Sequence, residues 1–402
     1  MLNVKFYKKN AIHIVTYLLY IIIYLVTLQL FGMGDSYARI RYYILAVAVI
    51  IIFIELILRY RSGFFKNKKI YSKELLFTIF TSVIFALVSI NKAKLVGYPL
   101  DMRTLVQISL MLLPSLYVFG FNNIFSTKTI IKFMKFTLIA VIIAYFCEPK
   151  HTIFNFLNPS NWASINIFTS KSFTESSLCS ETFLQLFLFF NYFKNIKDEN
   201  INKKSLKLYC MISLIFTILS FKRLSMVFAL SIILLRKIVD LRSKINKKII
   251  YILSIFFTII TIYYLKFMTG ELNILGINVY EFTTGRDYIL SLWQKTNYFS
   301  YGYGTSMLVI GRYLEMDLIQ IYLELNVYCL FLFAYTFFRI AKNNLYSLLI
   351  MCYVFFNMLT ASSLPTSLPW IILLTTISLI SSDKCKDENI NINIESIKIK
   401  TR

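Results

Sequence analysis

Long apolar runs separated by short polar stretches recur along the whole chain. Runs of about 20 apolar residues have the length that an α-helix needs to cross a bilayer. The pattern predicts spans near residues 11–32, 42–58, 75–91, 104–120, 130–148, 176–193, 208–221, 224–239, 249–268, 316–338, 343–359 and 364–381. The sequence therefore predicts an all-α, polytopic integral membrane protein with about 12 transmembrane helices.

The composition excludes a soluble globule and gives a simple domain organisation. Hydrophobic residues make up 57% of the chain, and the mean hydropathy is +0.65. The first apolar run follows a basic N-terminus and continues to about Phe31 without a small-residue cleavage site, which is typical of a first transmembrane helix rather than a removed signal peptide. We expect one membrane domain over 1–382 and a cytoplasmic polar tail over 383–402.

The distribution of charge predicts the orientation of the chain. Most of the 43 basic residues fall in the N-terminus, the tail and every second connection between the spans. Because Lys and Arg are retained on the cytoplasmic side, both termini are expected to be cytoplasmic, in a cytoplasmic (inner) membrane. The net charge of +23 is spread over short loops. It indicates topology and contact with anionic lipid headgroups, and no nucleic-acid partner is expected.

With this topology, two long loops face outward, at 149–175 and at about 269–315. Loops of this length are uncommon unless they are functional or disordered, and neither is a low-complexity sequence. We therefore expect two ordered, functional outward loops.

Several kinds of chemistry find no support in the sequence. The six cysteines form no CxxC pair, and His13 and His151 are the only histidines, so neither a metal site nor a cofactor is expected. No P-loop, GxGxxG or GxSxG motif is present. A nucleotide-driven pump or a serine hydrolase is therefore unsupported.

Three outward cations are candidates for binding an anion. Lys222 and Arg223 lie in the tight hairpin LSFKRLS, where cations need an anionic partner or an aqueous cavity unless they reach lipid headgroups. Arg286 follows Gly285 in the larger loop. An arginine fork matches phosphate oxygens bidentately better than a lysine does.

Acidic residues supply candidate bases. Glu315 and Asp317 open a span at its outer end, where stabilisation of the helix N-terminus is the alternative explanation. Glu324 lies about two turns deeper, which calls for a partner or a water-filled cavity. Glu175 and Glu181 bracket the start of another span.

Five segments, in this order, carry a resemblance to a known family: SFTESSLCSETF at 172–183, LSFKRLSM at 219–226, TTGRDYILSLW at 283–293, YGYG at 301–304 and EMDLIQIYLELN at 315–326. Together they resemble the Wzy-type O-antigen and capsular repeat-unit polymerases, a superfamily that also holds the O-antigen ligases. The family pattern has an S-x-R segment opening a span, a G-R-x-x-x-W-like segment in a large outward loop, a G-x-G, and a helix with an acidic motif that ends in E-x-G.

The resemblance implies roles for particular cations and aromatic residues. Arg286 matches the loop arginine that engages lipid-linked diphosphate, and Arg223, preceded by Lys222, matches the arginine of the S-x-R segment. Outward aromatic rings could stack on sugars. The candidates are Trp293, Tyr288 and Tyr303.

The resemblance also ranks the acids. Asp317 falls where polymerases carry an acid, and Glu315 falls where ligases have His. Asn326 replaces the usual Gly of the helix end. The missing histidine favours a polymerase over a ligase, with Asp317, Glu315 or Glu175 as the catalytic carboxylate and Glu181 next.

The sequence thus predicts a metal-independent glycosyltransferase that joins undecaprenyl-diphosphate-linked oligosaccharide repeat units into O-antigen or capsular polysaccharide. Such an activated donor requires only cations for the diphosphate and a base for the acceptor hydroxyl. Besides this substrate, membrane lipids, a flippase and a chain-length regulator are the expected partners. A ligase of the same superfamily, and a lipid-linked oligosaccharide flippase or transporter, are the alternatives. The gathering of unusual charges at the outer face favours an enzyme over a flippase.

Overall fold

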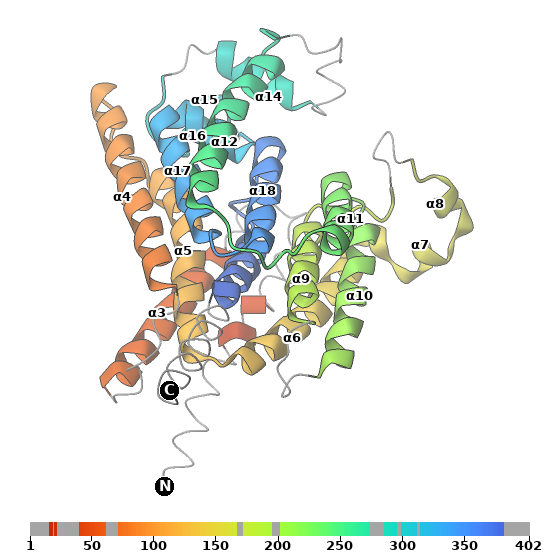
Figure 1. Ribbon diagram of the computed structural model, residues 1–402. Coiled ribbons are helices and arrows are strands. Elements are labelled where there is room, and N and C mark those ends of the chain that lie inside the picture. The colour runs from red at the N-terminus through yellow and green to blue at the C-terminus, as the bar shows by residue number, and fades with distance from the viewer. Residues whose placement is uncertain are drawn as a thin grey trace. The chain divides into compact units, whose positions relative to one another are not determined.

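The computed structural model describes residues 16–18, 20–21, 40–61, 71–166, 172–194, 202–272, 285–295, 299–311 and 314–381, and their regular elements are helices (Figure 1). The chain divides into two compact units. Unit 1 comprises 1–70, 116–240 and 368–402, and unit 2 comprises 71–115 and 241–367. Helix α5 (Met102–Ile124) runs through both, and its internal Pro114 lies beside the division.

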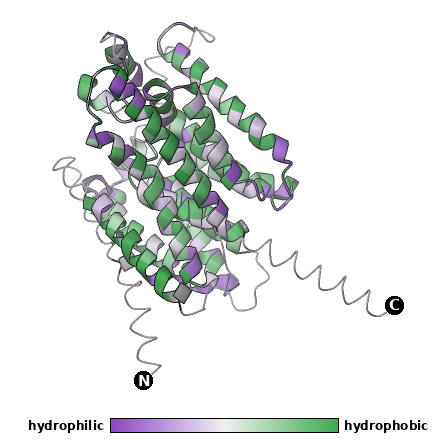
Figure 2. Cartoon of the chain, turned by 90° about the vertical axis from the view of Figure 1, so that its left-hand side faces the viewer, coloured by the Kyte–Doolittle hydropathy of each residue, from purple (hydrophilic) through white to green (hydrophobic). Residues whose placement is uncertain are grey.

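Within the described residues, five helices are long and apolar enough to cross a membrane. Hydrophobic residues predominate along much of the helical part of the chain (Figure 2). This makes the chain a helical membrane protein, as the hydropathy pattern predicted. The five spans have mean hydropathies from 1.7 to 2.4. They belong to α3 (Ile40–Arg61), α4 (Ser72–Leu95), α5, α6 (Thr127–Cys147) and α12 (Lys247–Met268).

The remaining expected spans correspond to shorter helices. Each has 14 to 17 residues, fewer than the roughly 20 of a typical span. They are α9 (Ser180–Phe193), α10 (Lys203–Leu219), α11 (Arg223–Ile238), α17 (Val327–Ile340) and α18 (Leu345–Thr360), followed by the C-terminal helix Ser367–Ser381. The expected span 11–32 and the tail 383–402 lie largely or wholly outside the described residues. The total of 12 spans stays a prediction.

The expected span at 316–338 is two helices, α16 (Asp317–Glu324) and α17. Asn326 explains the break, because its side-chain Oδ1 accepts a hydrogen bond from the Cys329 N–H at 2.8 Å. Asparagine is a strong N-cap residue, so a new helix begins after it. The residue that departs from the family pattern thus has a local structural role.

Polar caps also set the start of other helices. In each case the side-chain oxygen of the residue before the helix accepts from a backbone N–H two or three residues later, which satisfies a donor that the helix leaves open. The capping residues are Ser126 for α6, Asn202 for α10, Asn246 for α12 and Asn344 for α18.

Unit 1 is built around α9, which packs against α6, α10 and α11 (Figure 1). Its Phe- and Leu-rich sequence is apolar on every face, as in a helix that is surrounded by others. Nearly all of its side chains are buried. Asn191, a polar residue in this helix, accepts hydrogen bonds from Arg236 of α11.

Unit 2 is organised around α17, which packs against α4 and α12. The buried face of α4 carries small polar residues that allow close helix packing. The hydroxyls of Thr81 and Thr336 lie 2.7 Å apart across the interface between α4 and α17. Thr81 also donates to the carbonyl of Phe77 one turn earlier, so its polar atoms are satisfied.

The two long loops contain short helices where they are described. Residues 149–166 form a 3-10 turn η2 (Pro149–His151) and the helices α7 (Ile153–Leu157) and α8 (Pro159–Ala163). The larger loop contains α14 (Arg286–Lys295) and α15 (Ser306–Ile310).

Candidate functional site

A fully buried carboxylate holds the loop that carries the YGYG sequence. Glu324 ends α16 with 0% exposure. Its carboxylate oxygens accept hydrogen bonds from the N–H groups of Gly304 at 2.6 Å and Ser306 at 2.9 Å, and from Gln320 Nε2 at 2.9 Å. The position of Glu324 about two turns inside a predicted span called for a polar partner, and these three donors are its partners. Through them, Glu324 fixes the start of α15 to α16.

Glycine is required twice in this loop because the backbone approaches α4 and α5 closely. Gly302 has φ +127°, and a Cβ there would lie 3.0 Å from the Cβ of Ser89. Gly304 has φ +82°, and its Cβ would lie 2.4 Å from Cγ of Gln107. Between them, the Tyr303 N–H donates to Ser89 Oγ at 3.1 Å. The G-x-G thus serves loop packing within unit 2.

We expect Gly304→Ala to destabilise unit 2 more than Gly311→Ala. Both glycines have positive φ, but the space around Gly311 is open, whereas a Cβ at position 304 meets Gln107. The substitution at 311 should cost about 1 kcal/mol from backbone strain, and the one at 304 about 1–3 kcal/mol more from overpacking. Thermal unfolding of the purified variants in detergent would test this, and equal losses would contradict it.

Asp317 holds a second loop. It is 2% exposed, and its carboxylate accepts from the N–H groups of Ser363 at 2.6 Å and Leu364 at 2.8 Å and from the Ser362 hydroxyl at 3.1 Å. These bonds fix the 362–364 turn after α18 to the start of α16. Asp317, the first predicted base, is therefore an acceptor for buried backbone donors, with little surface left for a substrate.

Helix α14 is anchored on its neighbours by an apolar cluster. Ile289 and Leu290 of α14 are buried in this cluster, which we call the α14 cluster. Its other members come from the end of α12, from the segment just before α16 and from α16 itself, namely Phe267, Met268, Leu314, Met316 and Ile319. The cluster packs the buried side of α14 against the end of α12 and the segment that leads into α16.

Two predicted site residues lie at the border of the α14 cluster. Arg286 begins α14 and is half-buried, and its spacing from Ile289, Leu290 and Trp293 puts all four on one helix face. Glu315 is exposed between the buried neighbours Leu314 and Met316. Arg286 and Glu315 thus each lie in a segment that contributes buried residues to the same apolar cluster.

The three predicted sugar-stacking residues have different surroundings. Tyr288 is 56% exposed and Trp293 is half-buried, so both retain accessible ring surface. Tyr303 is only 1% exposed, and its ring meets that of Phe85 edge-on at 5.4 Å between centroids. Because Tyr303 belongs to the core of unit 2, its ring has no face open to a sugar.

The other predicted site residues belong to unit 1. Lys222 and Arg223 lie at the turn between α10 and α11, and the expected anionic partner of Lys222 is Glu175, with Nζ and Oε1 3.5 Å apart. About a third of each side chain of this pair is exposed, so the ion pair contributes little to stability. Glu181 is half-buried in the first turn of α9.

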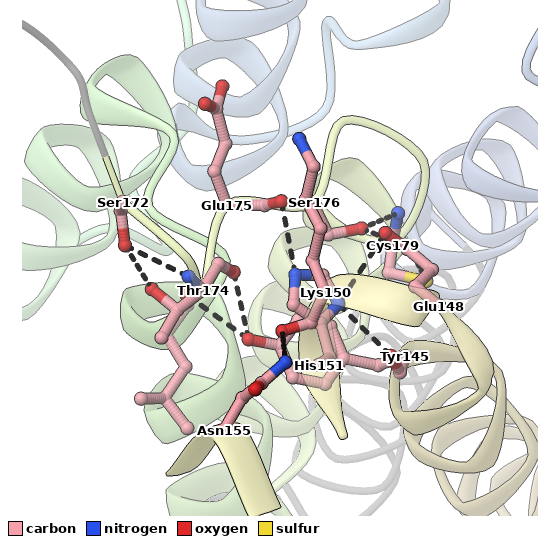
Figure 3. A network of polar contacts seen from close by, with 11 residues as sticks. Tyr145, Glu148, Lys150, His151, Asn155, Ser172, Thr174, Glu175, Ser176 and Cys179 are labelled. Atoms are coloured by element: carbon pink, nitrogen blue, oxygen red, sulfur yellow. Dashed lines mark hydrogen bonds and ion pairs between the residues drawn. The ribbon is translucent and has the colours of Figure 1, made fainter. Parts of the chain in front are cut away.

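A polar network beside this ion pair was not predicted from the sequence (Figure 3). The buried His151 ring lies between two backbone carbonyls, with Nδ1 3.0 Å from the Tyr145 oxygen and Nε2 3.1 Å from the Glu175 oxygen. The Tyr145 ring stacks on it at 4.0 Å. The Glu148 carboxylate lies 3.5 Å from Nδ1 and accepts from Ser176 Oγ at 2.7 Å.

This network positions Glu175. Its backbone oxygen faces His151, while its carboxylate points away from the network (Figure 3). A neutral imidazole has one N–H and can donate to one of the two carbonyls, whereas an imidazolium donates to both. The sequence signal for this network was slight: Glu148 and His151 lie three residues apart at the end of an apolar run.

The structure thus divides the predicted site residues between the two units. Arg286, Glu315 and Asp317 belong to unit 2, and Glu175, Lys222 and Arg223 to unit 1. Among the described residues, no three His, Cys, Asp or Glu side chains gather where they could hold a metal ion. In comparisons with known proteins, no family model, curated protein or solved structure matches the chain.

Proposed function

We propose that the chain is a polymerase that joins undecaprenyl-diphosphate-linked oligosaccharide repeat units at the outer face of a cytoplasmic membrane. The supporting observation is the placement of Arg286, which opens a helix held by the α14 cluster, next to the segment that carries the exposed Glu315. A cation and an open carboxylate beside one apolar cluster suit a lipid-linked diphosphate and an acceptor hydroxyl. The resemblance of five ordered sequence segments to the polymerase family supports the same function.

In the proposed reaction, the hydroxyl of an acceptor sugar attacks the anomeric carbon of the lipid-linked donor glycan. The bond between that carbon and the diphosphate oxygen breaks, and undecaprenyl diphosphate leaves with the electron pair. The Arg286 guanidinium stabilises the negative charge of the leaving group. A carboxylate takes the hydroxyl proton. We assign this role to Glu315, because Asp317 is engaged with backbone donors.

In this scheme, Tyr288 and Trp293 present ring surface to the glycan, and Tyr303 is no longer a candidate. Lys222 and Arg223 remain further candidates for binding the diphosphate, and Glu175 remains a candidate base. A flippase that delivers repeat units and a chain-length regulator are the expected partners, and membrane lipids surround the apolar helices.

Deletion of the gene distinguishes the proposed polymerase from its alternatives. Loss of a polymerase should leave single repeat units made and exported, because only their joining is missing. Loss of a ligase should leave long polymer on undecaprenyl diphosphate, and loss of a flippase should trap single units inside. Analysis of the lipid-linked glycans on each side of the membrane would distinguish these results, and accumulated long polymer would refute the polymerase.

We expect Arg286→Lys to shorten the polymer strongly although the positive charge is kept. A lysine cannot reproduce the bidentate fork, and a lost charge-assisted hydrogen bond of about 1.5–3 kcal/mol corresponds to roughly a 10- to 150-fold slower reaction. The measurement is polymer length at equal protein level. Lys295→Gln is the matched control, because Lys295 lies at the other end of α14 and is exposed. Wild-type length in Arg286→Lys would remove Arg286 from the site.

A further inference from the structure

The helices α7 and α8 form a compact projection, residues 152–163, which we call the paddle (Figure 1). Side chains bind its own backbone: Trp162 Nε1 donates to the Phe156 oxygen at 2.8 Å, and Asn161 Nδ2 donates to the Asn155 oxygen at 3.0 Å. Thr152 caps α7, and Asn158 caps α8. The paddle is therefore a folded element with defined faces.

Aromatic rings join one side of the paddle to the segment that follows it. The rings of Phe156, Trp162 and Phe173 contact one another, with centroids 5.1 to 5.8 Å apart. Phe173 lies two residues before Glu175, so this aromatic cluster joins the paddle to the segment that forms the ion pair with Lys222.

The other face exposes large apolar side chains. Ile153 is 65% exposed, Phe154 84% and Leu157 73%. These residues lie outside the helices that are long and apolar enough to cross a membrane. Their exposure is therefore not explained by the lipid-facing side of such a helix. An apolar face of this kind in water is unfavourable and marks a binding surface.

The attachment of the paddle indicates what covers this face. The paddle follows α6, a 21-residue helix that is apolar enough to cross a membrane and ends at Cys147. The chain does not extend away from that end, because the His151 ring contacts the carbonyl of Tyr145 in the last turn of α6. The paddle is thus held close to the C-terminal end of α6.

The charges around the paddle fit the same location. No acidic residue lies between Glu148 and Glu175, and Lys150 at the entry to the paddle is exposed. Trp162 adds an aromatic ring with a polar N–H. Basic and aromatic residues with an apolar face are the composition of segments that lie in the membrane interface.

We propose that the paddle inserts Ile153, Phe154 and Leu157 into the leaflet of the bilayer in which α6 ends. The lipid surface is then the binding partner of this face, and the aromatic cluster with Phe173 sets Glu175 and Lys222 near the level of the lipid headgroups. The proposal concerns a surface of unit 1 and does not depend on the proposed enzymatic activity.

A fluorescence-quenching experiment on the full chain tests this proposal. An environment-sensitive fluorescent amino acid is incorporated in place of Phe154, Leu157 or Ser160, and the protein is reconstituted into nanodiscs of phosphatidylethanolamine and phosphatidylglycerol. Doxyl-labelled lipid quenches from the membrane, and iodide quenches from water. Ser160 is the control position, because it is exposed on the polar α8 of the same paddle.

We expect the probes at 154 and 157 to be quenched several times more strongly by doxyl lipid than the probe at 160, and to be shielded from iodide. Equal iodide quenching at 154, 157 and 160 would place the face in water and overturn the proposal. Shielding of 154 and 157 from both quenchers would also overturn it, because protein rather than lipid would then cover the face. The two apolar positions are independent tests, since either substitution alone could disturb the paddle.

Discussion

Glu324→Ala is expected to lower the free energy of unfolding of the protein by about 3 kcal/mol or more. The substitution would leave three donors, the N–H groups of Gly304 and Ser306 and the Gln320 amide, without their acceptor in a buried environment. Each unsatisfied buried donor costs about 1–3 kcal/mol. Because these bonds connect α15 to α16, we also expect the loop with the YGYG sequence to lose its fixed position. Thermal unfolding in detergent, together with limited proteolysis at 299–311, measures both effects.

Two matched variants isolate the cause of this loss. Glu324→Gln keeps the size and one acceptor oxygen but turns an NH₂ group toward backbone donors, so an intermediate loss is expected. Glu315→Ala removes a carboxylate that is exposed in the same region, and its effect on stability should stay within about 0.5 kcal/mol. If Glu324→Ala and Glu315→Ala were equally stable, the buried carboxylate would not hold the loop.

Glu315→Gln is expected to give the largest loss of activity without a loss of stability. Glutamine keeps the size and the hydrogen-bonding groups of the side chain but cannot accept the hydroxyl proton. Removal of a general base lowers rates by about 100-fold or more. Because Glu315 is exposed, the unfolding temperature should be unchanged. The measurements are chain elongation at equal protein level and thermal unfolding of the same preparation.

Asp317→Asn is the informative comparison, because it was the first candidate base from the sequence. Its NH₂ group would meet the donors that the carboxylate now accepts, so a loss of stability of about 1–3 kcal/mol is expected. Elongation should fall only as far as the amount of folded protein falls. Lost elongation in Asp317→Asn at full stability would instead make Asp317 the base. If neither variant affected elongation, Glu175→Gln would be tested next.

The hydrophobic pattern located the helices well but not their continuity. The apolar runs predicted α3, α4, α5, α6 and α12, because helix length and hydropathy are local properties. The tight turn before Arg223 was also predicted, since it depends on a few neighbouring residues. The break at Asn326 was missed because an apolar run on both sides outweighed a single capping residue.

The roles of the acidic and aromatic residues required the tertiary structure. Asp317 and Glu315 lie two residues apart in one motif, yet one is buried against the 362–364 turn and the other is exposed. Tyr303 resembles a surface aromatic in the sequence but packs against Phe85 of α4. Each difference arises from contacts with residues tens or hundreds of positions away, which local patterns do not contain.

The sequence by itself determined that this protein is helical, belongs in a membrane and carries its unusual charges in a few short segments. These properties follow from composition and from periodicity along the chain. Only the tertiary structure decided which carboxylates are structural, which glycines are needed for close packing, and that His151 lies between two backbone carbonyls. The physical reason is that burial and hydrogen-bond partners are set by which segments meet in space. The same residue type therefore stabilises a loop in one place and remains exposed in another.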